Sequence, residues 1–88
     1  MQLKNDLGSV TRFRNELTVL SEDLEGSRCK VAADIQTLSE TWNDPKFQEF
    51  YARYEKDDEF LRRLIDKINE FNDGYLYNME VALTDYQN

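Results

Sequence analysis

The stretch Trp42-Asn43-Asp44-Pro45 decides the fold, because it ends one helical pattern and begins another. Pro45 cannot continue a helix, and it biases the residue before it away from helical dihedral angles. Asp44 is a favoured N-cap residue, and proline is well tolerated at the first position of a helix. The sequence therefore predicts a turn over residues 42–45 and a second helix that begins at Pro45.

On the N-terminal side of this turn, large apolar residues recur at steps of three, four and seven, which is typical of one face of a helix. They are Leu3, Leu7, Val10, Phe13, Leu17, Leu20, Leu24, Val31, Ile35, Leu38 and Trp42. We expect a first helix over about residues 3–41. Gly26 is the expected place for a bend, because glycine in a helix interior costs about 1 kcal/mol relative to alanine.

A second apolar stripe follows the turn and predicts a helix over about residues 45–85. It consists of Phe47, Phe50, Tyr54, Leu61, Leu64, Ile68, Phe71, Tyr75, Met79, Ala82 and Tyr86. The tripeptide Asn72-Asp73-Gly74 leaves two alternatives, because it is also a signal for a helix end. Either a short third helix follows it, or one helix continues with a kink at 72–74. The unbroken stripe favours the second.

These patterns predict an all-α fold in which residues 1–88 form one antiparallel two-helix hairpin. A lone hairpin would leave the wide second stripe in water, so we expect two hairpins to pair as a four-helix bundle. The partner is a second copy or a similar hairpin, giving a homodimer or a heterodimer. The residues expected at the interface are Leu17, Leu20, Leu24, Phe47, Tyr54, Leu61, Leu64, Ile68, Phe71 and Tyr75.

The composition of the chain argues against several classes of function. The formal net charge of -7 argues against binding nucleic acid or anionic membranes. Cys29 is the single cysteine and there is no histidine, so the sequence predicts no disulfide framework, no metal site and no cofactor. It contains no apolar run long enough to span a membrane and no signal-peptide pattern. We expect a cytoplasmic protein, or one exported without a cleaved signal peptide.

The segment from Trp42 to Phe50 resembles the turn of the WXG family, the early secretory antigen-like helical hairpins of bacterial type VII secretion. Trp42 and Phe50 match the family pattern in identity and spacing. Asp44 stands where the family has glycine, and neither Tyr75 nor Tyr77 is followed four residues later by an acidic residue. The resemblance implies a small bundle-forming protein of a bacterial secretion system.

Other candidate sites have plainer interpretations. Trp42 could be an exposed recognition residue, but it continues the first stripe and is expected to close the end of the core. The run Asp57-Asp58-Glu59 is expected to be a solvated face, because consecutive helical residues cannot converge on one cation; Asp57, however, falls within the second stripe and is expected to approach a cation of a partner chain. Tyr75, Tyr77 and Tyr86 are either rim residues or a C-terminal contact surface.

The sequence shows no nucleophile motif and no phosphate-binding loop, so we expect no enzyme. The leading hypothesis is a WXG-like secretion substrate, partner or chaperone. The alternative is a cytoplasmic acidic adaptor, or an antitoxin or immunity-type module, that binds a basic partner in a salt-dependent way.

Overall fold

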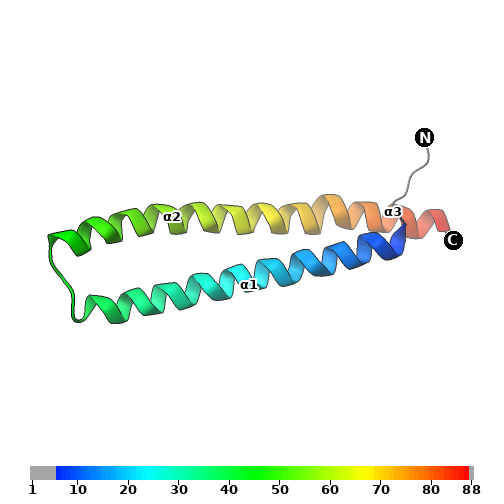
Figure 1. Ribbon diagram of the computed structural model, residues 1–88. Coiled ribbons are helices and arrows are strands. Elements are labelled where there is room, and N and C mark those ends of the chain that lie inside the picture. The colour runs from blue at the N-terminus through cyan, green and yellow to red at the C-terminus, as the bar shows by residue number, and fades with distance from the viewer. Residues whose placement is uncertain (1–5, 88) are drawn as a thin grey trace.

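A computed structural model describes residues 6–87, and every element in this range is helical. Helix α1 spans Leu7–Ser39 and helix α2 spans Pro45–Glu70. A π-helix, η1, spans Phe71–Leu76 and leads directly into α3, Tyr77–Gln87. Together α2, η1 and α3 form one arm that runs back along α1, so the described chain is an antiparallel hairpin with dimensions of 63 × 19 × 18 Å (Figure 1).

Side-chain caps fix where both helices begin. The carboxylate of Asp44 accepts a hydrogen bond from the backbone N–H of Phe47 at 2.9 Å, and Pro45 occupies the first turn of α2. At the start of α1, Asp6 accepts from the N–H of Ser9 at 2.7 Å. The helix start expected at residue 3, and Leu3 with it, lie outside the described residues.

Gly26, where we expected a bend or a frayed turn, does not interrupt the helix, because α1 runs from Leu7 to Ser39 without a break. A Cβ atom added at Gly26 would meet nothing within 4 Å, so no neighbouring group requires glycine there. The helical residues on both sides therefore keep α1 continuous through Gly26, despite the lower helix propensity of glycine.

The signal at residues 72–74 neither ends the second arm nor leaves it a regular α-helix. Residues 71–76 form the π-helix η1. A π-helix has nearly one residue more per turn than an α-helix. Two residues of this segment, Asn72 and Leu76, consequently face the first arm and are 3% and 5% exposed. Phe71 and Tyr75, which the apolar stripe placed in line with Ile68, are instead exposed.

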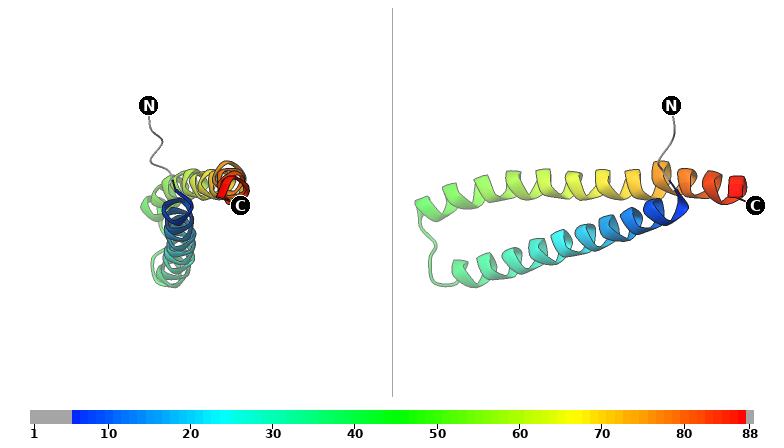
Figure 2. Two further views of the ribbon diagram at one scale, coloured as in Figure 1. Left: turned by 90° about the vertical axis from the view of Figure 1, so that its right-hand side faces the viewer. Right: turned by 45° about the vertical axis from the view of Figure 1, so that its right-hand side comes forward.

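The core is a thin seam between the two arms. Its buried apolar residues are Val10, Ile35, Phe47, Ile65 and Leu76, and no large side chain is fully buried among the described residues. The arms lie closer together near the chain ends than at the turn (Figures 1 and 2). Side-chain size gives a physical reason, because Trp42 and Phe47 fill the turn end whereas Ser21 and Asn72 lie on the seam further along.

Candidate functional site

The turn residues form an aromatic cluster at the tip of the hairpin. The half-buried Trp42 ring lies 5.2 Å from the ring of Phe47 in an edge-on arrangement and 6.3 Å from Phe50 in a stacked one, measured between centroids. Asn43 accepts a hydrogen bond from the side-chain amide of Gln48 at 2.7 Å. Burial and hydrogen bonding thus hold the turn in one conformation, with Trp42 closing the end of the seam.

Along α1 and into the turn that follows it, every seventh residue from Leu7 to Trp42 is buried or half-buried. The members of this series are Leu7, Arg14, Ser21, Arg28, Ile35 and Trp42. Residues seven apart share a face of a helix, so the series lies along the seam. Sequence reasoning missed the three polar members because it followed apolar residues only. The seven-residue spacing that connects Leu7 with Ile35 and Trp42 was the signal that could have identified them.

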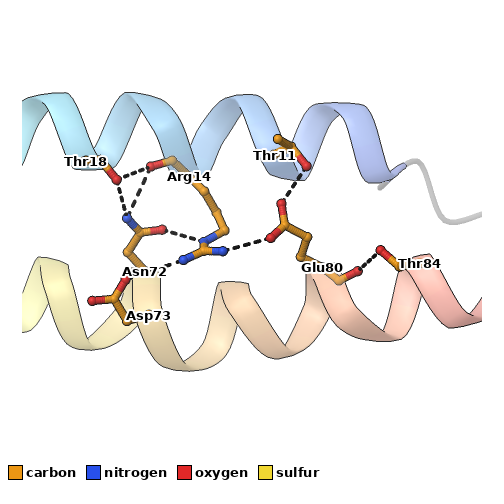
Figure 3. A network of polar contacts seen from close by, with 7 residues as sticks. All are labelled: Thr11, Arg14, Thr18, Asn72, Asp73, Glu80 and Thr84. Atoms are coloured by element: carbon orange, nitrogen blue, oxygen red, sulfur yellow. Dashed lines mark hydrogen bonds and ion pairs between the residues drawn. The ribbon is translucent and has the colours of Figure 1, made fainter.

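Arg14 is the centre of the first polar cluster, which joins α1 to η1 and α3 (Figure 3). Its Nε donates to Asn72 Oδ1 at 3.0 Å, and its Nη1 donates to Glu80 Oε1 at 2.8 Å. Asn72 returns two hydrogen bonds through Nδ2, to the Arg14 carbonyl oxygen at 3.2 Å and to Thr18 Oγ1 at 3.0 Å. Because each polar group meets a partner, this cluster can sit on the seam at little cost.

The carboxylate of Glu80 completes this cluster. Thr11 Oγ1 donates to Glu80 Oε2 at 2.6 Å, and this bond, followed by the one from Arg14, lowers the pKa of Glu80 below its usual value. The guanidinium of Arg14 also lies 5.4 Å from the ring centroid of Tyr77. The contacts of Arg14 therefore fix how α3 sits against the first turns of α1.

A second polar cluster lies near the middle of the hairpin. Arg28 binds Asp58 through two donors, Nε to Oδ1 at 2.8 Å and Nη2 to Oδ2 at 3.2 Å. Its Nη1 also donates to Glu25 at 2.7 Å, and the hydrogen bond to Asp58 is the main cause that raises the pKa of Arg28. The acidic run at residues 57–59 is thus not uniformly a solvated face, because the carboxylate of Asp58 is engaged across the seam.

The expected interface residues divide into two groups. Six face the other arm of the same hairpin and are buried or half-buried: Leu17, Leu24, Phe47, Tyr54, Leu61 and Ile68. Desolvation is the first cause of the raised pKa of Tyr54, in agreement with this placement. The other four are exposed: Leu20, Leu64, Phe71 and Tyr75. The rings of Phe71 and Tyr75 stack on each other with centroids 5.4 Å apart.

A groove of about 170 Å³ runs beside the seam at mid-length, and its lining includes Ser27 and Val31 of α1 and Asp57 of α2. Ser27 and Asp57 are therefore on the same side of the hairpin. Steps of seven from these three residues reach a row of large apolar side chains on that side. They are Phe13, Leu20, Val31 and Leu38 on the first arm and Phe50, Leu64 and Phe71 on the second.

We call these seven residues, with Ser27 and Asp57 between them, the open face. Each of the seven apolar side chains is between 41% and 46% exposed, so each is partly packed in the hairpin and partly in water. A second groove, lined by Val10, Phe13, Leu76 and Met79, continues the same side towards the chain ends. The open face is therefore a row of partly exposed apolar side chains that extends along both arms.

The described residues offer little else that could act as a site. Within residues 6–87 no group of His, Cys, Asp and Glu side chains is placed to hold a metal ion. None of the helices in this range is long and apolar enough to cross a membrane. Cys29 is exposed, and its Sγ lies 3.9 Å from a carboxylate oxygen of Glu25. The open face is accordingly the candidate functional site.

Comparison with known proteins identifies no relative: no family model, no curated protein and no solved structure matches this chain.

Proposed function

We propose that this chain is a non-enzymatic protein–protein interaction hairpin, which forms a four-helix bundle by covering its open face with a second helical hairpin. The observation that carries the proposal is the row of seven large apolar side chains, each 41–46% exposed, on one side of both arms. A soluble monomer seldom exposes so many large apolar side chains in one row. A second hairpin has the right shape, because two antiparallel helices can cover two others along their whole length.

The magnitudes favour reversible pairing. Full burial of a large apolar side chain is worth roughly 1.5–3 kcal/mol, so covering the exposed parts of seven such residues on each of two identical hairpins would contribute about 9–18 kcal/mol in total. Association itself costs about 4–15 kcal/mol in lost freedom of motion. Since the two terms are similar in size, pairing through the open face should depend on protein concentration.

The biological setting that we propose is that of the WXG family, in which the chain would be a secretion substrate, partner or chaperone. The support is the tip of the hairpin, where Trp42 stacks with Phe50 across a turn capped by Asp44. The acidic adaptor is the second candidate, supported by the net charge of -7. The two differ in what holds the partner, because apolar pairing resists salt whereas binding through surface charge weakens steeply with it.

Substituting aspartate for either of two neighbouring residues, Leu20 and Val19, tests the proposal. Leu20 is on the open face and 44% exposed, whereas Val19 is 54% exposed on another side of the same helix. In a dilution series followed by light scattering and circular dichroism, the unmodified chain should form dimers that dissociate on dilution. Leu20→Asp should weaken the dimer about tenfold or more, and Val19→Asp should leave it unchanged.

Two results would count against the proposal. One is a fully helical monomer at every concentration that stays monomeric when the charge of Asp57 is removed, with a thermal stability that Leu20→Asp leaves unaltered. The other is an equal effect of the two substitutions, which would mean that added negative charge, and not the open face, controls association.

A further inference from the structure

Asp57 is the charged residue at the centre of the open face, and Asp34, seven residues after Ser27, adds a second exposed carboxylate on the same side. Asp57 lines the mid-length groove beside Val31, with Tyr54 and Leu61 on its own helix. Its neighbour Asp58 is bound by Arg28 across the seam, whereas Asp57 is exposed and makes no ion pair or hydrogen bond with any described residue. Covering the open face would thus bury a carboxylate among apolar side chains, which is unfavourable unless the covering chain supplies a cation.

Two arginines of this chain lie near Asp57 and are engaged elsewhere, whereas Lys56, the residue before it, lines a different groove of α2 together with Glu55 and Glu59. Arg28 donates hydrogen bonds to Asp58 and to Glu25. Arg53, one helical turn before Asp57, instead pairs with Glu49 at 3.5 Å. The open face itself contains no Lys or Arg. A second copy would therefore bring another Asp57 and a net charge of -7. Its lysine beside the open face, Lys67, lies on the rim next to Leu64 and Phe71 and pairs with Glu70 at 3.6 Å.

We propose that the open face is built for a different helical chain, one whose apolar stripe carries a Lys or Arg where it meets Asp57. Asp57 then selects the partner in two ways, because it attracts the complementary cation and disfavours the pairing of two identical copies. This inference rests on the proposed function, since it names the partner that the same face accepts.

The first test asks whether Asp57 opposes self-pairing. Asp57→Leu removes the carboxylate from the open face and should strengthen self-association about tenfold or more in light-scattering dilution series. Asp66→Leu is the matched control, because Asp66 is an exposed residue of the same helix that lies outside the open face. Its self-association should equal that of the unmodified chain.

The second test supplies the missing cation from a modified copy of this chain. Partner hairpins can lie parallel or antiparallel, so two lysine positions are needed. In a parallel pair, Asp57 of one chain lies level with residue 57 of the other. In an antiparallel pair whose open faces overlap along their whole length, Asp57 lies closer to the level of Leu20. An equimolar mixture of the unmodified chain with Asp57→Lys or with Leu20→Lys should form mixed dimers about tenfold tighter than the unmodified homodimer. Asp66→Lys and Val19→Lys, which change the net charge equally, should give no such gain.

The outcomes separate the inference from the function on which it rests. If the unmodified homodimer is as tight as the best mixed pair, or if the control lysines work equally well, the inference is wrong. If Asp57→Leu dimerises but neither mixed pair does, the open face still binds hairpins and only the need for a cation is refuted. If no combination associates, Asp57→Leu included, the proposed function fails as well.

Discussion

At the scale of single residues, the hairpin depends on side chains that do more than fill space. Asn72 is 3% exposed, yet both atoms of its amide group are used: Oδ1 accepts from Arg14 and Nδ2 donates to the Arg14 carbonyl oxygen and to Thr18. An aliphatic residue at this position would leave Arg14 without an acceptor near the centre of the seam. Asn72 therefore specifies which level of η1 lies opposite Arg14.

Replacing Asn72 with alanine tests this role. The substitution removes three hydrogen bonds across the seam and leaves a small cavity, so the free energy of unfolding should fall by roughly 1–3 kcal/mol. Urea unfolding followed by circular dichroism would measure the change. Asn78→Ala is the control, since Asn78 is exposed, and it should cost less than about 0.5 kcal/mol. Equal losses for the two variants would show that Asn72 acts through helix propensity alone.

At the scale of helices, a carboxylate caps the N-terminus of α1 and another caps that of α2. These side chains accept hydrogen bonds best when they are ionised. The hydrogen bond from the N–H of Phe47 is the main cause that lowers the pKa of Asp44 below its ordinary value of 3.8. The same kind of bond, from the N–H of Ser9, lowers the pKa of Asp6. A carboxyl group whose pKa is lower in the folded state contributes stability that is present above the unfolded pKa and is lost as the pH falls through the folded pKa.

This linkage predicts how one variant changes the response to acid. Asparagine also caps helices but carries no titrating proton, so the melting temperature of Asp44→Asn should fall less than that of the unmodified chain between about pH 4 and pH 2. Thermal unfolding at a series of pH values would show the difference. Asp66→Asn, which removes an exposed carboxylate near the C-terminal end of α2, is the control. Parallel curves for the unmodified chain and Asp44→Asn would contradict the capping role.

Gly26 provides a prediction about α1. Because the helix is continuous and a Cβ atom at residue 26 would meet nothing within 4 Å, Gly26→Ala should raise the free energy of unfolding by about 1 kcal/mol. Gly8→Ala should contribute less, since Gly8 lies in the first turn of the helix, where an added Cβ would be 3.5 Å from Asp6 Oδ1. Denaturant unfolding would compare the two, and destabilisation by Gly26→Ala would indicate a bend that glycine relieves.

The helices themselves could be predicted from the sequence because their signals are local. Asp44 and Pro45 begin α2 through their own backbone preferences, and apolar residues at steps of three and four specify a helix whatever they pack against. What could not be predicted depends on both arms at once. The burial of Arg14 and Arg28 on the seam follows from acceptors that lie more than 25 residues away along the chain, at Asn72 and Asp58. The π-helix likewise depends on which face of η1 meets α1.

At the scale of the whole molecule, the hairpin is long and has little interior. Five apolar residues are buried in a body 63 Å long, and each of them retains between 4% and 8% of its exposure. A small domain of this kind has little stability to spare. Covering the open face would therefore change the stability of the fold, and not only its oligomeric state.

This coupling predicts that the melting temperature depends on protein concentration. Binding that occurs only in the folded state stabilises it by mass action, so each tenfold rise in concentration should raise the melting temperature measurably. Leu20→Asp should flatten the dependence, whereas Val19→Asp should retain it. Differential scanning calorimetry over a concentration series would test this, and a melting temperature that is constant for the unmodified chain would show that the folded chain does not self-associate in that concentration range.

The π-helix η1 can also be regarded as a single surplus residue in an otherwise regular repeat. If Gly74 were deleted, Leu76, Glu80 and Leu83 would follow Asn72 by three, seven and ten residues, which is the spacing that the seam of α2 already keeps. The shortened chain should fold with a continuous α-helix and unchanged pairing of the arms, as judged by circular dichroism and unfolding. Deletion of Glu55 in α2 should be far more damaging, because no π-turn there can take up the change of phase. Among such one-residue deletions, the second arm is therefore expected to be most tolerant within residues 71–76.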